Sequence, residues 1–238
     1  MRAIDKIFNK LKEFDNETYP EGVVPLFDRI EGTSFFPGGD GLWKYENDIT
    51  DIRIGGIMVI GHNFDNVSGF KKSLALGSES LACPTWKNLR ILFQEANIDL
   101  TSCYFTNAYM GLMNSQSNIG VFPGSKSSSF KKQCLDFLEY QISIQQPQTI
   151  ITLGRFVPPL LAQLSIDLDQ WKKVKSFNDL DQAEIQIIKH AHFCENQVIS
   201  NIVALTHPAN RHLNIQKRKY KNLNGHDAEL AMLREILF

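Results

Sequence analysis

The sequence contains no long hydrophobic run. None of its 238 residues belongs to a stretch approaching the roughly 18 consecutive apolar residues of a membrane-spanning helix. Residues 1–16 mix charged residues such as Asp5, Lys6 and Glu13 with apolar ones, so they do not have the pattern of a secretory signal peptide. We therefore expect a cytoplasmic protein without a membrane partner.

Cysteine and net charge are also scarce. The 4 cysteines show no Cys-x-x-Cys spacing, which favours reduced thiols over a zinc or iron–sulfur site built from them. The histidines form no His-Glu-x-x-His arrangement, so we expect no metal and no other cofactor. The net charge of -1 gives no overall attraction to nucleic acid or acidic membranes, so either partner would have to be bound by a local patch.

The sequence does contain four short, strongly apolar runs, at residues 57–60, 103–106, 149–153 and 202–206. Such runs are typical of strands buried on both faces of a parallel sheet. Apolar residues at helical spacing predict helices at 3–15, 84–96, 130–145, 160–164 and 227–237. This alternation predicts an α/β fold, a three-layer α/β/α sandwich around a mainly parallel four-stranded sheet. We expect one domain over residues 1–238, with an N-terminal helix and loop at 1–51.

Polar stretches interrupt this pattern. Residues 65–83 and 111–129 are rich in glycine, serine or asparagine and are expected to be loops, whereas residues 166–196 do not clearly fit a helix or a strand. The glycine-rich segment 38–41 leaves open an unrelated α/β enzyme that binds a nucleotide there. No Gly-x-x-x-x-Gly-Lys-Ser/Thr motif follows this segment, so simple turns are the other interpretation.

Each predicted strand ends near a distinctive residue, namely Asn63, Asn107, Gly154 and His207. Parallel strands end at one edge of a sheet, and ligands of open α/β folds bind at that edge. We therefore expect these residues to meet in one cleft. Taken singly, the asparagines and His207 are equally residues that form or cap turns.

In their order and spacing, these strand ends resemble the uracil-DNA glycosylase superfamily, from about residue 36 to residue 212. Gly61-His62-Asn63-Phe64-Asp65 occupies the place of the first family motif. Tyr104-Phe105-Thr106-Asn107 is similar to the strand that carries a base-reading Asn. Thr152-Leu153-Gly154-Arg155 is similar to a Leu-Gly strand end of one branch, and His207-Pro208-Ala209-Asn210-Arg211 resembles the second motif.

The resemblance implies a DNA glycosylase that hydrolyses the bond between deoxyribose and a flipped, uracil-like base. Asn63 would position the attacking water, and His207 would bind the base oxygen as negative charge develops on it. Asn107 would read the base edge through its amide, helped by the backbone N–H of His62. The alternative is a catalytically inactive relative that binds nucleic acid or a free base.

The first motif departs from the family pattern. Phe64 replaces the usual Pro, and Asp65 adds a possible charge beside the base pocket that both residues would line. The aromatic residue expected to stack on the base is missing near Thr85, where Trp86 or Phe70 could substitute. These changes bear on both uracil specificity and activity.

The resemblance also implies DNA as the partner. Arg211 lies where relatives insert a Leu or Arg wedge into the stack, directly after Asn210. The basic run at 217–221 contains Lys217 and Lys219, and it is either a solvated surface or a phosphate-binding patch.

Overall fold

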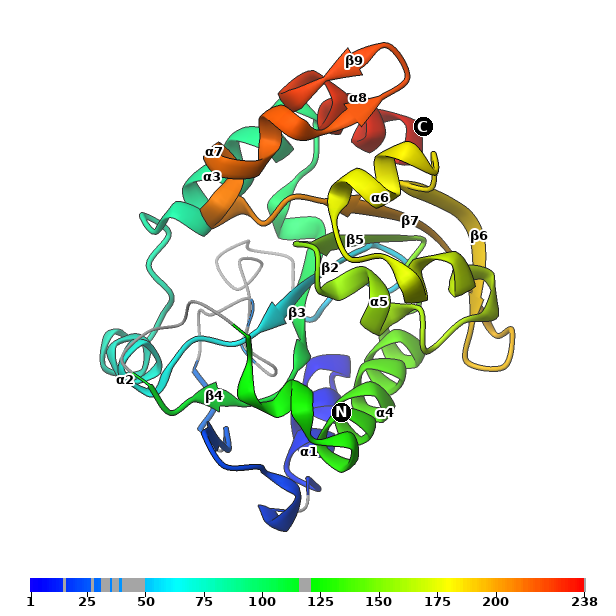
Figure 1. Ribbon diagram of the computed structural model, residues 1–238. Coiled ribbons are helices and arrows are strands. Elements are labelled where there is room, and N and C mark those ends of the chain that lie inside the picture. The colour runs from blue at the N-terminus through cyan, green and yellow to red at the C-terminus, as the bar shows by residue number, and fades with distance from the viewer. Residues whose placement is uncertain are drawn as a thin grey trace.

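A five-stranded sheet is the centre of the fold (Figure 1). The computed structural model describes residues 1–14, 16–26, 28–30, 35, 39, 50–115 and 121–237. The strands of this sheet, in spatial order, are β3 (Cys103–Tyr109), β2 (Ile57–Asn63), β5 (Thr149–Leu153), β7 (Val198–Leu205) and β6 (Ile187–Phe193). The first four are parallel to one another, and β6 runs antiparallel beside β7. The predicted mainly parallel α/β sheet is confirmed, with one strand more than expected.

The additional strand, β6, lies within the ambiguous stretch 166–196. A bulge between Ile188 and Ala191, with His190 at a φ of 59°, interrupts the apolar–polar alternation by which a strand is recognised. The strand is also at the edge of the sheet, where Lys189 and His190 are exposed. Its sequence pattern is therefore weaker than that of the buried parallel strands.

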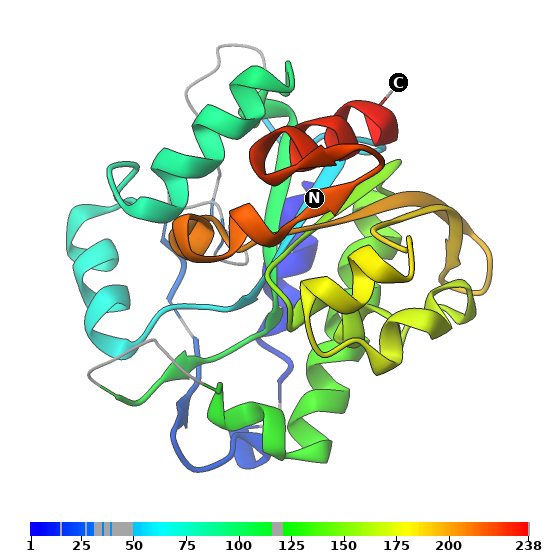
Figure 2. The same cartoon turned by 45° about the horizontal axis from the view of Figure 1, so that its top comes forward.

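Helices cover both faces of the sheet (Figures 1 and 2). The α-helices are α1 (Ala3–Leu11), α2 (Val67–Leu76), α3 (Pro84–Glu95), α4 (Ser128–Gln145), α5 (Val157–Leu161), α6 (Phe177–Gln182), α7 (Arg211–Asn214) and α8 (Gly225–Leu237). The Thr106 hydroxyl of β3 donates to Gln141 of α4, at 2.7 Å, whereas the ring of Phe105 packs 5.0 Å from that of Trp86 in α3. Successive strand residues point to opposite faces, so α4 and α3 lie on opposite sides of the sheet.

The remaining long helices pair with these two. The Nε2–H of His226 in α8 donates to the Glu95 carboxylate of α3 at 2.5 Å, and Phe14, just after α1, packs edge-on against Phe137 of α4. α1 and α4 therefore form one outer layer, and α3 and α8 form the other. The predicted three-layer α/β/α architecture is confirmed.

The expected helices are all present, but one expected loop is wrong. Residues 65–83 contain α2, which begins where the Asn66 side chain accepts the N–H of Gly69 and ends at Gly77, with a φ of 72°. Phe70 is its only buried residue. Because a helix with so few buried positions has no apolar stripe, its caps are the only sequence signal for it.

Short elements complete the described chain. They are the paired strands β1 (Val23–Val24) and β4 (Leu112–Met113), the hairpin strands β8 (Lys219–Tyr220) and β9 (Leu223–Asn224), and the 3₁₀ helices η1 (Asn16–Thr18), η3 (Leu100–Ser102), η4 (Pro123–Lys126), η5 (Ile166–Lys173), η6 (Pro208–Asn210) and η7 (Ile215–Lys217). No helix among the described residues is both long and apolar enough to cross a membrane. Gly38, Asp40 and Gly41, the basis of the nucleotide-loop alternative, lie outside the described residues.

Candidate active site

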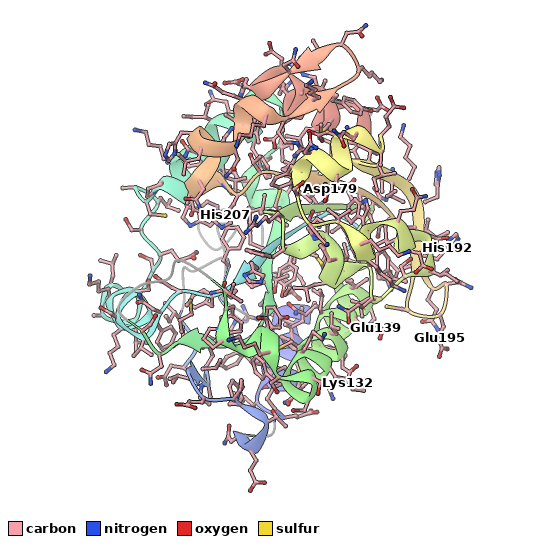
Figure 3. All side chains as sticks on the ribbon, viewed as in Figure 1. Lys132, Glu139, Asp179, His192, Glu195 and His207 are labelled. Carbon is pink, nitrogen blue, oxygen red and sulfur yellow. The ribbon has the colours of Figure 1, made fainter. Side chains whose placement is uncertain are left out.

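The strand register brings the predicted strand-end residues to one edge of the sheet. Gly61 of β2 is the direct partner of Asn107 in β3. The N–H of Gly154 donates to the carbonyl of Leu205 at 2.8 Å, so the loop after β5 lies beside the turn after β7. In that turn, the Cβ of His207 is 3.3 Å from the position that a Cβ on Gly154 would occupy. The edge therefore carries Asn107, the Gly61 segment, Gly154 and His207. Figure 3 labels His207.

Asn107 is held between β2 and the N-terminal segment. Its side chain is 4% exposed, and its Nδ2 donates to the carbonyl of Phe35 at 2.8 Å. Its Oδ1 lies directly against Gly61, where any Cβ would overlap it. Glycine at position 61 therefore makes room for the amide, and Phe35 occupies the donor that a base would use.

His62 and Asn63 contact each other at the end of β2. The His62 Nδ1 is 2.9 Å from the Asn63 Oδ1, and the Asn63 Nδ2 donates to the carbonyl of Phe64 at 2.5 Å. Because the amide oxygen accepts, His62 carries its proton on Nδ1. Burial lowers the pKa of His62 to about 4, against the effect of the Asn63 hydrogen bond, and the nearby His207 lowers it further. The imidazole is therefore neutral at pH 7.

His207 has one ring nitrogen occupied and one available. The N–H of Ala209 donates to its Nδ1 at 3.3 Å, so the proton of the neutral ring is on Nε2. Within the described part of the chain, Nε2 has no hydrogen-bond partner. Burial lowers the pKa of this imidazole, which keeps it neutral at pH 7. Asn88 of α3 donates to the carbonyl of Pro208 at 2.8 Å and so fixes the turn.

The other predicted base-binding residues pack more deeply. Phe64 is buried against Phe70, at 6.2 Å between ring centroids, and the Asp65 Oδ1 accepts the N–H of Asn66 at 2.7 Å. Trp86 is buried between Phe35 and Phe105. Neither aromatic candidate, Trp86 or Phe70, is therefore exposed for stacking.

Phe35 is instead an aromatic residue that lies beside Asn107. Its Cδ1 is 3.7 Å from the position of a Cβ on Gly61, and its ring packs 5.1 Å from Phe105. Sequence spacing alone could not identify this residue, because it is distant in the chain from both strand-end motifs.

Arg211, the predicted wedge, is held in a buried ion-pair network. Its guanidinium bonds Glu229, donates to the Thr206 hydroxyl at 3.3 Å and donates to the His226 Nδ1 at 2.9 Å. The side chain is only 11% exposed. Glu229 is fully buried and also binds Arg218 at 3.1 Å. Insertion of Arg211 into DNA would require it to leave these partners.

The predicted basic run divides into buried and exposed residues. Arg218 is fully buried and pairs with Asp181 and Glu229, each at 3.1 Å. Lys217 and Lys219 are exposed, and in the described chain neither forms an ion pair. Asn210 is also exposed, in η6. The surface available for DNA phosphates is therefore smaller than the sequence indicates.

Other residues lie at this edge that the motif comparison missed. Tyr109 follows Asn107 by two residues and therefore lies on the same face of β3. Phe156 follows Gly154 by two residues, and its ring centroid is 5.0 Å from that of His62. Position after a strand-end motif is a signal that could have identified both.

His192 and Glu195 are remote from this edge. Figure 3 shows His192 and Glu195 at the far side of the sheet from His207. Among the residues that the structure describes, no group of three or more His, Cys, Asp or Glu side chains could hold a metal ion.

Comparison with known families agrees with the motifs and the fold. Residues 68–228 match the family model described as the uracil DNA glycosylase superfamily. The match spans more than half of the 238-residue chain and includes Asn107, Gly154 and His207, whereas the segment Gly61-His62-Asn63 precedes it. No curated protein matches the chain. The parallel sheet, its polar carboxyl edge and this match together identify the chain as a member of the uracil-DNA glycosylase superfamily.

Proposed function

We propose that the protein is a DNA glycosylase that hydrolyses the N-glycosidic bond of a flipped, uracil-like base. Family membership supports the reaction class. The observation that carries the proposal is the state of His207, a partly buried neutral imidazole whose Nε2–H is available at the ligand-binding edge of the sheet.

The chemistry calls for such a donor. When the bond between the sugar C1′ and the base nitrogen breaks, its electron pair moves onto the base and negative charge develops on a carbonyl oxygen of the base. A neutral imidazole can donate its N–H to that oxygen. Its interaction strengthens as the charge grows, so it stabilises the transition state more than the ground state.

Asn63 is proposed to hold the attacking water. Its Oδ1 accepts from His62, and a carbonyl oxygen has a second lone pair with which to orient a water molecule. The water oxygen adds to the sugar C1′, and a water proton ends on the released base. His62, by fixing the Asn63 amide, acts as a positioning residue.

Asn107 is proposed to read the base. Its Nδ2 already donates to a carbonyl, that of Phe35, and a uracil carbonyl offers the same type of acceptor. Cytosine presents an amino group at that place, which Nδ2 cannot bind. In this proposal the base replaces the Phe35 carbonyl when it enters.

DNA contact is proposed to use the exposed residues after the second motif. Asn210, Lys217 and Lys219 can reach phosphates without breaking an ion pair. Leu213 of α7 is 62% exposed and is better placed than the paired Arg211 to enter a base stack.

One observation favours a second candidate, a non-catalytic relative that binds nucleic acid or a free base. Both polar atoms of the Asn63 amide are engaged by adjacent residues, His62 and Phe64. If this arrangement persists with DNA bound, the residue orients no water. Binding without base release would then select this candidate.

The test is base release from oligonucleotides that carry a panel of deaminated and damaged bases, with alkali cleavage to reveal abasic sites. We expect His207→Ala to lower the rate by about 10²–10³-fold, the usual effect of removing one oxyanion donor. Asn63→Ala should also lower it. His212→Ala, which changes an exposed histidine of α7, should not. Thermal unfolding checks that each variant is folded. No release from any lesion by the unmutated protein would refute the proposal.

A further inference from the structure

A cleft of about 440 Å³ opens beside His62, on the side of the sheet edge that α5 covers. Its volume is within the range of small-molecule sites, about 300–1,000 Å³. The residues that define it here are His62, Tyr109, Lys131, Arg155, Phe156 and Lys175, and we call it the basic cleft. They come from β2, β3, α4, the start of α5 and the segment before α6.

The basic cleft is lined by three cations, of which Lys175 also feels the charge of Asp179 outside the lining. Lys131, Arg155 and Lys175 line it, and no carboxylate is among its described lining residues. None of these three cations forms an ion pair within the described residues. Three unpaired like charges around one hollow create a local positive potential that attracts an anion, although the net charge of the chain is -1.

The Tyr109 side chain also lines this hollow. Tyr109 is 2% exposed, with its ring packed at 5.1 Å from Phe122 and edge-on at 5.4 Å from His62. Its hydroxyl forms no hydrogen bond with any described residue, although the residue lines the cleft. This hydroxyl can therefore donate a hydrogen bond to a ligand in the cleft.

One wall of the basic cleft consists of planar groups. The Phe156 ring is tilted by 33° to that of His62 at 5.0 Å between centroids, and the Arg155 guanidinium lies 4.6 Å from the Phe156 centroid. Phe156 is 39% exposed, unusually open for a large aromatic side chain. Aromatic rings and guanidinium planes are the surfaces on which unpaired bases stack.

We propose that the basic cleft binds one unpaired nucleotide of a single DNA strand, next to the nucleotide whose base is released. Its phosphate would contact the cations, its base would stack on Phe156 and Arg155, and the Tyr109 hydroxyl would donate to it. A base in a duplex is already stacked on both faces and paired, so only a single strand can supply this nucleotide. The location beside the lesion depends on the proposed glycosylase function, whereas the binding itself does not.

The charge around the cleft limits the site to about one nucleotide. A neighbouring hollow of about 340 Å³ shares Lys131 and Gln163 with the basic cleft, but Asp136 and Glu139 of α4 line it. These carboxylates repel phosphates, so the positive surface ends there. Figure 3 labels Glu139 and Lys132 along this part of α4.

The test measures binding of a lesion-free single-stranded oligonucleotide, and of the duplex with the same sequence, by fluorescence anisotropy across a salt series. We expect tighter binding to the single strand. Phe156→Leu should weaken it by roughly 5- to 100-fold, the usual effect of losing one stacked base. Lys131→Gln and Arg155→Gln should each reduce the slope of log K against log salt by about 0.7. The matched control is Lys132→Gln, because Lys132 is adjacent but pairs with Asp136 outside the cleft.

Several outcomes would overturn the proposal. If Phe156→Leu melts normally and binds the single strand as tightly as the unmutated protein, then Phe156 does not stack on a base. If the unmutated protein binds the duplex as tightly as the single strand, then the site does not require an unpaired nucleotide. If Phe156→Leu does not fold, the salt slopes of Lys131→Gln and Arg155→Gln decide instead. If a free deoxynucleoside monophosphate raises the melting temperature and oligonucleotide binding is unchanged in all the variants, the cleft binds free nucleotides instead. If inorganic phosphate raises the melting temperature equally, the cleft binds anions alone.

The two proposals fail separately. The binding assay uses no lesion, so a protein that releases no base can still bind a single strand through the basic cleft. Conversely, base release with single-strand affinity unaffected by Phe156→Leu would retain the glycosylase function and reject this site.

Discussion

Two polar regions that follow β7 differ in how their side chains are satisfied. His207 has a ring nitrogen without a partner in the described chain, and it meets the equally neutral His62. Four residues later, Arg211 is bound by Glu229, Thr206 and His226. The first region is partly buried and has unused hydrogen-bonding capacity, whereas the side chains of the second are paired with one another.

This difference separates a region that can bind a ligand from a region that holds the backbone in place. The Nε2–H of the partly buried His207 is free to donate to a ligand. A buried ion pair offers a ligand nothing, but it fixes the backbone around it. Glu229 accepts the N–H of Thr206 at 2.6 Å, so the saturated region holds the residue directly before His207. In the proposed function, His207 takes part in the chemistry and Glu229 holds the backbone before it.

The largest expected effect tests the supporting region. Glu229→Ala leaves the buried guanidinium groups of Arg211 and Arg218 without their shared carboxylate. We expect a loss of about 3–5 kcal/mol in the free energy of unfolding, measured by urea denaturation. Glu235→Ala, which removes a partly exposed partner of Lys221, should cost less than about 1 kcal/mol. Similar losses in the two variants would contradict the comparison.

The next effect tests the unsatisfied region through pH. His62 has a pKa of about 4 in the folded protein and an ordinary value of 6.5 when unfolded. The unfolded chain therefore binds a proton first as pH falls, so stability is complete above pH 6.5 and is lost between pH 6.5 and 4. The shift corresponds to about 3 kcal/mol. Urea denaturation over this range should show a shallower pH dependence for His62→Gln than for the unmutated protein, whereas His212→Gln should retain it.

The sequence predicts the first region better than the second, for a physical reason. Asn63, Asn107 and His207 could be identified because they follow buried strands, and the register of parallel strands brings such positions together. Glu229 and Arg218 meet only through the packing of α8 and the hairpin against β7, and nothing in their local sequence marks them as buried. The exposed appearance of the run at 217–221 was misleading at Arg218.

The same limit applies within the site itself. Phe35 reaches Asn107 from a distant segment, and Lys131 and Lys175 reach the basic cleft from α4 and the segment before α6. None of these residues follows a strand, so the periodicity of the sequence does not predict where they lie. The parallel sheet could be predicted because each strand has its own apolar pattern. Contacts between distant segments leave no such local pattern in the sequence.

The smallest expected effect examines the close packing within the unsatisfied region. A Cβ at position 61 would overlap the Asn107 Oδ1, so Gly61→Ala should cost roughly 1 kcal/mol of unfolding free energy, at the low end for overpacking because an amide can rotate. In an Asn107→Ala background the overlap is gone, and the same change should be neutral or slightly stabilising, since alanine restricts the unfolded chain more than glycine does. A double-mutant cycle measures this difference. An equal cost in both backgrounds would mean that position 61 needs glycine for a reason other than the Asn107 amide. The close packing of Gly61 against Asn107 would then not explain why glycine is at this position of β2.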